Sequence, residues 1–418
     1  MTVWNQPGKE NENMGLYKYH PEPSGRMGLL WTLALISDAV VLEYGAMGHM
    51  LYAQKWLKQT RVKNPGKLYT THLDEKDIAL GITTRLEEAV NEIVQRDWPK
   101  AIFLLPSSIP EVTGIDLDLL GDEIQQKHGD IPIVVMKKGG FKDKFSQGIE
   151  EALYKILRII PGQEKPIRKL TYNIIGSCAD LNKFQSDERE LNRILKGAFG
   201  MEPLCCLSSN STVEKIREMG CAHINLVIRR EGIKAAEELQ RRFGTPYIYA
   251  RPYGYDGTRD WLESIGKSLD MRADQKFIGK ELSEGLDICR YCRQMLKFKK
   301  HKGRISAGGN IDVVNGIMNF ACNELGLEKG FVWCDSREYE TEEIPYWNEA
   351  VWMKNIDRNI TGILMAGKEV LAKAGKDTAP AISRGLDSWN FNWYTPAYMG
   401  FRGAMNLCSL WLEFLSED

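Results

Sequence analysis

The sequence alternates short apolar runs with longer amphipathic stretches, and this alternation limits the fold more than any other feature. Such a pattern is typical of βαβ units, in which helices cross between the strands of parallel sheets. The expected strands are 39–44, 101–105, 131–136, 170–176, 203–207, 224–228, 247–250, 304–307, 330–334 and 362–365. The chain is therefore predicted to be an α/β protein.

The alternation falls into three rounds, and a length of 418 residues also predicts about three domains. The first round contains the expected helices 84–95 and 146–159, and Pro161-Gly162 opens a linker. The second round is a β-α-β-α-β-α-β module. The third begins with a long helix, 278–299, and ends in an aromatic and glycine-rich tail, 388–403, before a last helix. We predict domains at 1–165, 166–275 and 276–418.

Composition excludes several classes of protein. A net charge of −1 provides no field for holding nucleic acid. The most apolar stretch, 27–47, is interrupted by Asp38 and Glu43, so it predicts a buried helix and strand rather than a membrane span. The polar start lacks a secretory signal, which predicts a cytoplasmic protein. Nine cysteines are too few for a disulfide scaffold.

Familiar short motifs do not assign a function. No Gly-x-Gly-x-x-Gly follows a strand, and Trp261 stands where the first glycine of a phosphate loop ending at 266–268 belongs. Cys289 and Cys292 lie three apart within an expected helix, which favours packing over metal or redox chemistry. His49 lies in a glycine-flanked turn after a strand, where a structural and a functional histidine remain equally open.

Ligands of parallel α/β sheets bind outside the carboxyl ends of the strands. We therefore expect a site in the strand-end loops 176–183, 229–232, 251–258 and 308–312. Cys178 lies in the first of these loops. It could be a ligand in a cavity, a reactive thiol, or a loop cysteine without a function. Several arginines in or near such loops would suit a carboxylate ligand, unless they are simply solvated: Arg229, Arg230, Arg251, Arg384 and Arg402.

The order of several short segments along the chain is also informative. They are MGLLWTLALISDAVVLEYGAMGHMLY at 27–52, Asn-Ile-Ile-Gly at 173–176, Ile-Asn-Leu-Val at 224–227, Phe-Gly-Thr-Pro-Tyr at 243–247, Ser-Trp-Asn-Phe at 388–391 and Tyr-Met-Gly-Phe-Arg-Gly at 398–403. Together they resemble the nitrogenase component 1 family: dinitrogenase subunits, cofactor-assembly scaffolds, and light-independent protochlorophyllide and chlorin reductases. The resemblance implies three tandem Rossmann-like domains with parallel sheets.

The resemblance also implies metal sites that this sequence does not reproduce. Three cysteines of the family's first domain bind an iron–sulfur cluster shared with a partner subunit. Their places fall near Ser24 and on His49 and Ser108 here, although such clusters are normally held by thiolates. The family's cofactor cysteine and histidine fall on Arg229 and Asp387. The sequence therefore identifies no metal ligand, and nitrogen fixation by this chain is not expected.

The resemblance implies three functional hypotheses. In the first, the chain is a subunit of a nitrogenase-like oxidoreductase that receives electrons from an ATP-dependent iron–sulfur reductase. A related subunit would supply most or all ligands of a shared [4Fe-4S]-type cluster, and a small molecule or tetrapyrrole-like substrate would bind near Cys178, Arg229 and Asp387. The second is a non-catalytic metallocofactor scaffold or carrier. The third is a metal-free small-molecule binding protein. The resemblance also implies that the chain forms a homo- or hetero-oligomer with a related subunit.

Overall fold

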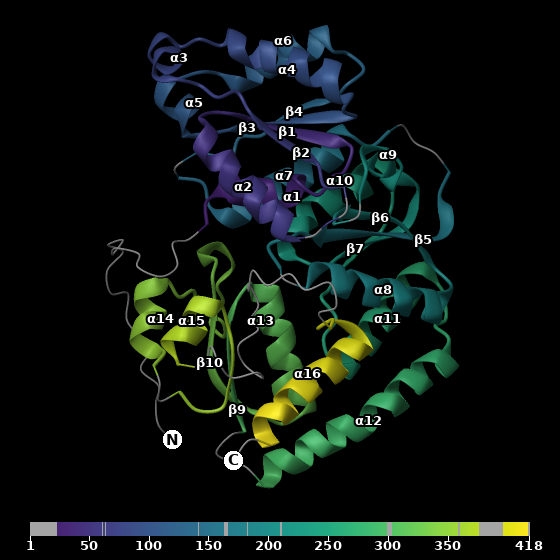
Figure 1. Cartoon of the computed structure of the whole chain (residues 1–418). Coiled ribbons are helices and arrows are strands. Elements are labelled where there is room, and N and C mark those ends of the chain that lie inside the picture. Colours follow the sequence, from purple (N-terminus) through teal and green to yellow (C-terminus); the bar gives the residue numbers. More distant parts are fainter. Residues whose placement is uncertain are drawn as a thin grey trace.

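The computed structural model describes residues 23–416 except 61, 63, 141, 163–165, 182, 210, 299–302, 358–359 and 376–395. Its strands form three separate sheets with the orders β2-β1-β3-β4, β6-β5-β7-β8 and β10-β9-β11. Every paired strand in them is parallel. The predicted α/β class with parallel sheets is thus confirmed. Figure 1 shows one sheet above another, with the third below them.

The first sheet is built from β1 (Ala39–Tyr44), β2 (Lys67–Thr70), β3 (Ala101–Pro106) and β4 (Ile133–Val135). Its outer face packs against α4 (Thr84–Asp97) and α6 (Leu117–Lys127). The expected strands of this round are present, whereas β2 was not expected. The remaining helices are α1 (Gly25–Leu33), α2 (Met47–Thr60), α3 (Glu75–Leu80), α5 (Ser108–Thr113) and α7 (Phe145–Ile159).

The second sheet contains β5 (Arg168–Ser177), β6 (Glu202–Ser208), β7 (Ala222–Val227) and β8 (Tyr247–Tyr249). The expected β-α-β-α-β-α-β module is present, with helices α8 (Phe184–Phe199), α9 (Val213–Arg217) and α10 (Ile233–Phe243). One difference concerns the expected loop 251–258: helix α11 (Tyr255–Leu269) already begins within it.

The third sheet contains β9 (Arg304–Gly309), β10 (Glu328–Cys334) and β11 (Ile363–Met365). The long expected helix is α12 (Gln275–Phe298), and the final one is α16 (Gly400–Ser416). After β9 come helix α13 (Ile311–Met318) and a π-helical turn, Asn319–Glu324. The smaller helices are α14 (Glu349–Asn355) and α15 (Lys368–Lys373).

Helices α1 and α7 lie between the first and second sheets (Figure 1). One apolar cluster joins residues of β1 and β3 through these helices to residues of β5, β6 and β7. The two helices cross closely because Gly148 has no side chain: a Cβ there would lie 1.9 Å from the carbonyl oxygen of Gly25. The first two units therefore share a core.

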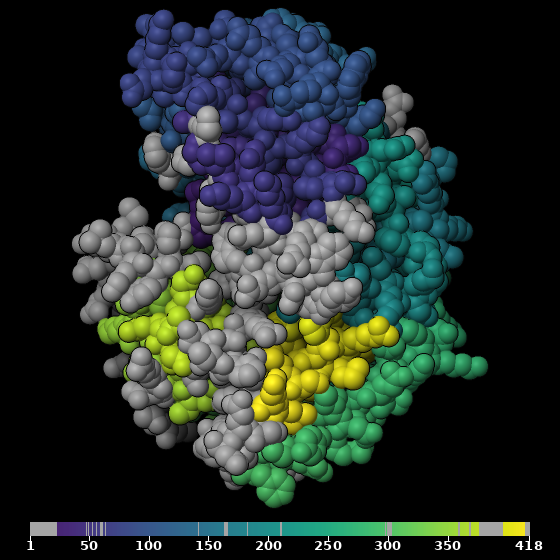
Figure 2. All heavy atoms as spheres, viewed as in Figure 1, coloured from purple at the N-terminus to yellow at the C-terminus, as the bar shows by residue number. Residues whose placement is uncertain are grey.

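The three units follow one another in space as they do in sequence, which Figure 2 shows as successive blocks of colour. The predicted boundaries at 165 and 275 stay a prediction, because the apolar clusters run across them. The predicted buried helix and strand within 27–47 are α1 and β1. Among the described residues, no helix has the length and apolar character needed to cross a membrane.

Candidate functional site

The strand order of the second sheet reverses between β5 and β7, because β6 lies on one side of β5 and β8 on the far side of β7. The loops that follow β5 and β7 therefore diverge at their carboxyl ends, where α/β proteins bind ligands. These are two of the loops in which the sequence predicts a site. Gly176 makes the arrangement possible: its φ is +100°, and a Cβ there would lie 2.4 Å from the Cγ of Arg229.

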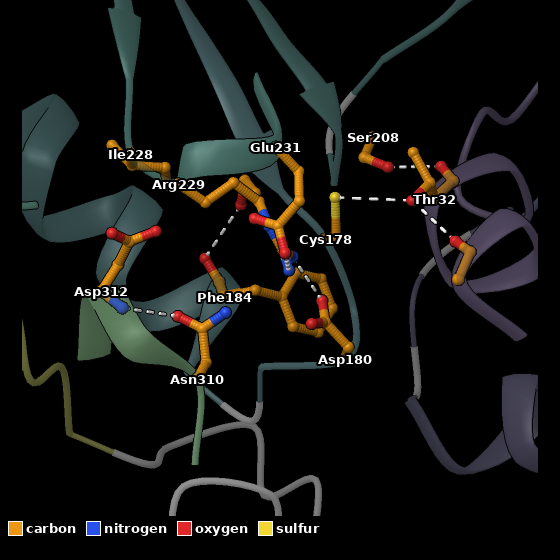
Figure 3. Close-up of polar contacts among 12 residues, drawn as sticks. Thr32, Cys178, Asp180, Phe184, Ser208, Ile228, Arg229, Glu231, Asn310 and Asp312 are labelled. Carbon is orange, nitrogen blue, oxygen red and sulfur yellow. Dashed lines mark hydrogen bonds and ion pairs between the residues drawn. The ribbon is translucent and has the colours of Figure 1, made fainter. Parts of the chain in front are cut away.

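Arg229 is fully buried at this point and is paired with two carboxylates (Figure 3). Its Nη1 lies 2.8 Å from Asp180 Oδ1, while Nε and Nη2 donate to the two oxygens of Glu231 at 3.0 and 3.1 Å. Burial disfavours the charged form, but the attraction of these carboxylates outweighs burial and holds the pKa of Arg229 well above its ordinary value. We call Arg229, Asp180 and Glu231 the Arg229 triad.

The third unit contributes Asp312 to the same region (Figure 3). Its Oδ2 accepts the backbone N–H of Arg230 at 2.7 Å, and its Oδ1 accepts the hydroxyl of Tyr249. Burial raises the pKa of Asp312 and raises that of Tyr249 to about 12. Asn310 positions the carboxylate, since its side chain caps α13 by accepting the N–H of Asp312 at 3.1 Å.

A second buried ion pair lies beyond β8. Arg251 Nη2 is 3.2 Å from Asp187 Oδ2. The other oxygen of Asp187 accepts the backbone N–H groups of Tyr398 and Met399 at 2.7 and 3.0 Å. This carboxylate thus fixes the segment that enters α16.

The arginines predicted to gather near the strand ends are therefore only partly brought together. Arg229 and Arg251 are buried and ion-paired within the chain, so they are neither solvated nor open to an added carboxylate on those faces. The guanidinium of Arg230 lies 5.3 Å from the ring centre of Tyr339. Arg402 is exposed, and Arg384 lies outside the described residues.

Cys178 is fully buried between the second sheet and α1. Its Sγ lies 3.7 Å from Thr32 Oγ1, and Ser208 donates to the Thr32 carbonyl (Figure 3). Burial raises the pKa of Cys178 to about 11 despite the charge of Arg229. The thiol is therefore protonated at neutral pH, and its predicted catalytic role stays a prediction.

Two of the positions expected near a cluster mark the carboxyl edge of the first sheet. Ser108 begins α5 directly after β3, and His49 lies in the first turn of α2 shortly after β1, where the sequence predicts a turn. The strand ends are joined by Ser107, which donates to the Tyr44 carbonyl at 2.7 Å. Gly45 allows this approach, since a Cβ there would lie 2.7 Å from that of Ser107, whereas Gly48 borders open space.

Ser24 is exposed just before α1 and pairs by a single bridge with Lys144. At the three positions expected to border a cluster, the possible ligands are two serine hydroxyls and one histidine imidazole. Iron–sulfur clusters are held by thiolates, and the first of the nine cysteines is Cys178, beyond the first unit. These residues therefore do not fit a cluster half-site of the cysteine type. No group of three or more histidine, cysteine or acidic side chains suited to a metal ion occurs within the described part of the chain.

Two acidic residues named from the sequence, Asp387 and Glu43, have different outcomes. Asp387 lies outside the described residues. Glu43 is fully buried in β1, and both of its oxygens accept from the guanidinium of Arg26 in α1. It therefore holds α1 on the first sheet.

The sequence did not single out Asp180, Glu231, Tyr249 or Asp312. Asp180 and Glu231 lie two residues after Cys178 and Arg229, in loops already predicted to form a site. A search of those loops for carboxylates that could balance a buried arginine would have found both.

The fold and the site together define a class: an α/β protein of three parallel-sheet units whose inter-unit site is built from buried ion pairs. The chain belongs to the nitrogenase component 1 type oxidoreductases, whose family model matches residues 24–415. The predicted family is thus confirmed. In structure, nitrogenase Cp1 at pH 6.5 is similar with a TM-score of 0.79 and 15% identity, covering 97% of this chain and 94% of that one.

Curated relatives include assembly proteins, enzyme subunits and a reductase. The nitrogenase iron-molybdenum cofactor biosynthesis protein NifE of Clostridium pasteurianum is 26% identical over 74% of this chain and 67% of its own length. The nitrogenase molybdenum-iron protein alpha chain of the same organism is 23% identical over 74% and 59%. A subunit of the light-independent protochlorophyllide reductase of Dinoroseobacter shibae is 23% identical over 50% and 38%. The matches thus span two thirds or less of these relatives.

Proposed function

We propose that this chain is one subunit of a cytoplasmic nitrogenase-like oxidoreductase and that a related, cysteine-bearing subunit holds the iron–sulfur cluster. The observation that carries the proposal is the donor set at the carboxyl edge of the first sheet. It offers Ser108 and the His49 position but no thiolate, in a chain whose family model covers nearly its whole length. The partner would supply most or all cluster ligands, and Ser24, His49 and Ser108 would border the cluster.

The Arg229 triad supports a substrate site in which residue 229 is not a metal ligand. Its guanidinium makes three hydrogen bonds to two carboxylates, so these N–H groups are already occupied within the chain. We infer that the triad fixes the ends of β5 and β7 and that Asp312 fixes the third unit against them. Cys178 and Asp387 stay the candidate catalytic residues, for a small or tetrapyrrole-like substrate. Electrons would come from an ATP-dependent iron–sulfur reductase.

A second candidate function is a metallocofactor scaffold or carrier without catalysis. It is favoured by relatives whose names describe cofactor biosynthesis. A scaffold would release its metal group to an acceptor, whereas an oxidoreductase would retain it through turnover.

Iron content separates these functions. The full chain would be purified anaerobically alone and with a co-expressed related subunit, followed by iron analysis and EPR. Iron bound only in the complex supports the proposal, while a cluster on the isolated chain contradicts it. If iron is absent from both preparations, the remaining hypothesis is a metal-free small-molecule binding protein.

Turnover then distinguishes the two metal-bound functions. The iron-loaded complex would be mixed with a reductase component, ATP and dithionite, and separately with an apo-acceptor protein. Continued substrate reduction with constant iron content supports the oxidoreductase. Loss of iron to the acceptor without substrate reduction supports the scaffold.

A further inference from the structure

Three thiols converge where α12 packs against α16. Cys289 and Cys292 project from α12, and Cys408 projects from α16. The Sγ atoms of Cys289 and Cys408 are 3.7 Å apart, and Cys292 Sγ lies 3.9 Å from the carbonyl oxygen of Cys408. All three are buried, and Figures 1 and 2 both show α16 lying along α12. The fold thus brings together cysteines that are 119 residues apart.

The surroundings distinguish the two closest thiols. The hydrogen bond with Cys408 lowers the pKa of Cys289 more than burial raises it, and the nearby Arg293 charge lowers it further. The contacts with Cys289 and Cys292, together with burial, raise the pKa of Cys408. Cys289, which is also the slightly exposed member of the pair, is therefore the thiol that more readily forms a thiolate. Tyr255 comes close to α12 here because Gly285, one turn before Cys289, leaves room for its hydroxyl.

We propose that Cys289 and Cys408 form a reversible disulfide when the protein meets hydrogen peroxide, and that this bond joins α12 to α16. The Cys289 thiolate attacks one peroxide oxygen, the O–O bond breaks, and the departing hydroxide takes a proton to become water. The sulfur of Cys408 then attacks the Cys289 sulfenic acid, forming the S–S bond and releasing a second water. Two thiols are oxidised and one peroxide is reduced.

The geometry is close to that of the product. A disulfide needs sulfurs about 2.05 Å apart, so the two sulfur atoms have only a short distance to close between helices that are already packed together. Peroxide is small enough to reach a thiol under a thin cover of side chains, and Cys289 is the only one of the three with measurable exposure, at 5%.

The consequence is a fixed C-terminal helix. α16 begins at Gly400, directly after the two residues whose N–H groups Asp187 holds. A bond at Cys408 would tie this segment to α12 and so restrict movement next to the Arg251–Asp187 pair. The bond would act as a redox-sensitive restraint on the approach to the candidate site, independently of whether that site is catalytic.

The test uses the full chain, reduced with dithiothreitol, freed of reductant and exposed to stoichiometric hydrogen peroxide. Remaining thiols would be blocked with iodoacetamide in denaturant and the chain digested. We expect one linked pair of peptides containing Cys289 and Cys408, an intact mass lower by two hydrogens, and full reversal by dithiothreitol. The oxidised chain should also melt at a higher temperature than the reduced chain.

Variants give the controls. Cys289→Ser and Cys408→Ser should lose both the linked peptide and the peroxide-induced rise in melting temperature. Cys334→Ser should keep both, because the buried Cys334 thiol is hydrogen-bonded to the carbonyl oxygens of Ser336 and Ile344. If the variants fold poorly, peptide mapping of the unaltered chain still decides. The proposal is overturned if peroxide yields no Cys289–Cys408 link, links Cys292 instead, or yields the link only in denatured protein.

Discussion

The carboxylate of Asp312 in the third unit accepts the backbone N–H of Arg230 in the second at 2.7 Å. Because Tyr249 also donates to this carboxylate, a single side chain joins the ends of β7 and β8 to the start of α13. A buried ionisable group of the third unit thus contacts the ends of two strands of the second unit at the candidate site.

Asp312 should make stability depend on pH in a defined direction. Burial raises its pKa, so the folded protein keeps this proton to higher pH than the unfolded chain. Its contribution to the free energy of unfolding is therefore lost as pH rises from about 3.9, the unfolded value, through the folded pKa. Urea unfolding should show the parent losing stability relative to Asp312→Asn over this range. A pH-independent difference between the parent and Asp312→Asn would contradict the assignment.

Removing the charge of Arg229 should be costly. Arg229→Met leaves Asp180 and Glu231 buried without their cation, for which we expect a loss of about 3–5 kcal/mol in the free energy of unfolding. Neutralising all three residues, with Asp180→Asn and Glu231→Gln added, should recover part of this loss. Arg96→Met removes an exposed arginine that lies close to Glu92, Asp97 and the ring of Tyr69, and it should cost far less than Arg229→Met. Equal losses for Arg229→Met and Arg96→Met in urea titrations would refute the buried-triad explanation.

The crossing of α1 and α7 should not tolerate a methyl group. Gly148→Ala would place a Cβ 1.9 Å from a backbone oxygen of α1, which cannot move like a side-chain end. We expect a loss of about 1–3 kcal/mol and a lower melting temperature. Gly279→Ala, in α12 with open space around it, should instead be neutral or stabilising by up to about 1 kcal/mol. Calorimetry of the two variants compares them directly, and similar behaviour would show that the helices separate easily.

Cys178 should resist alkylation in the folded protein. It has no exposed surface and its pKa is raised to about 11, so neither access nor the thiolate form favours alkylation at neutral pH. Iodoacetamide should label the half-buried Cys322 first and Cys178 only after denaturation, as followed by peptide mass spectrometry. Rapid labelling of native Cys178 would instead strengthen its predicted catalytic role.

The sequence predicted the strands best where both faces are buried. The strand 39–44 is apolar throughout except for Glu43, and every residue of β1 is buried. The edge strand β2 was missed because only Leu68 of its four residues is buried, which leaves almost no apolar signal. Helix α11 was missed although Trp261, Leu262 and Ile265 form a buried face, because its first residues were included in the predicted loop 251–258.

The sequence predicted where the candidate site lies but not which side chains contact each other there. The loops after β5 and β7 were predicted because strand ends follow from strand positions. The carboxylates that pair with Arg229 could not be predicted. Asp180 lies 49 positions away in the sequence, and its contact with Arg229 depends on the register of β5 against β7. Local patterns carry no information about such pairing.

The placement of α1 and α7 between two sheets has a consequence for dissecting the chain. A fragment cut near residue 165 would keep both helices but lose the second sheet that covers their other side. Its apolar surface would face water, and the remaining fragment would expose the matching face of β5 and β7. The first two units should therefore be expressed and melted as one cooperative block, never as separable modules.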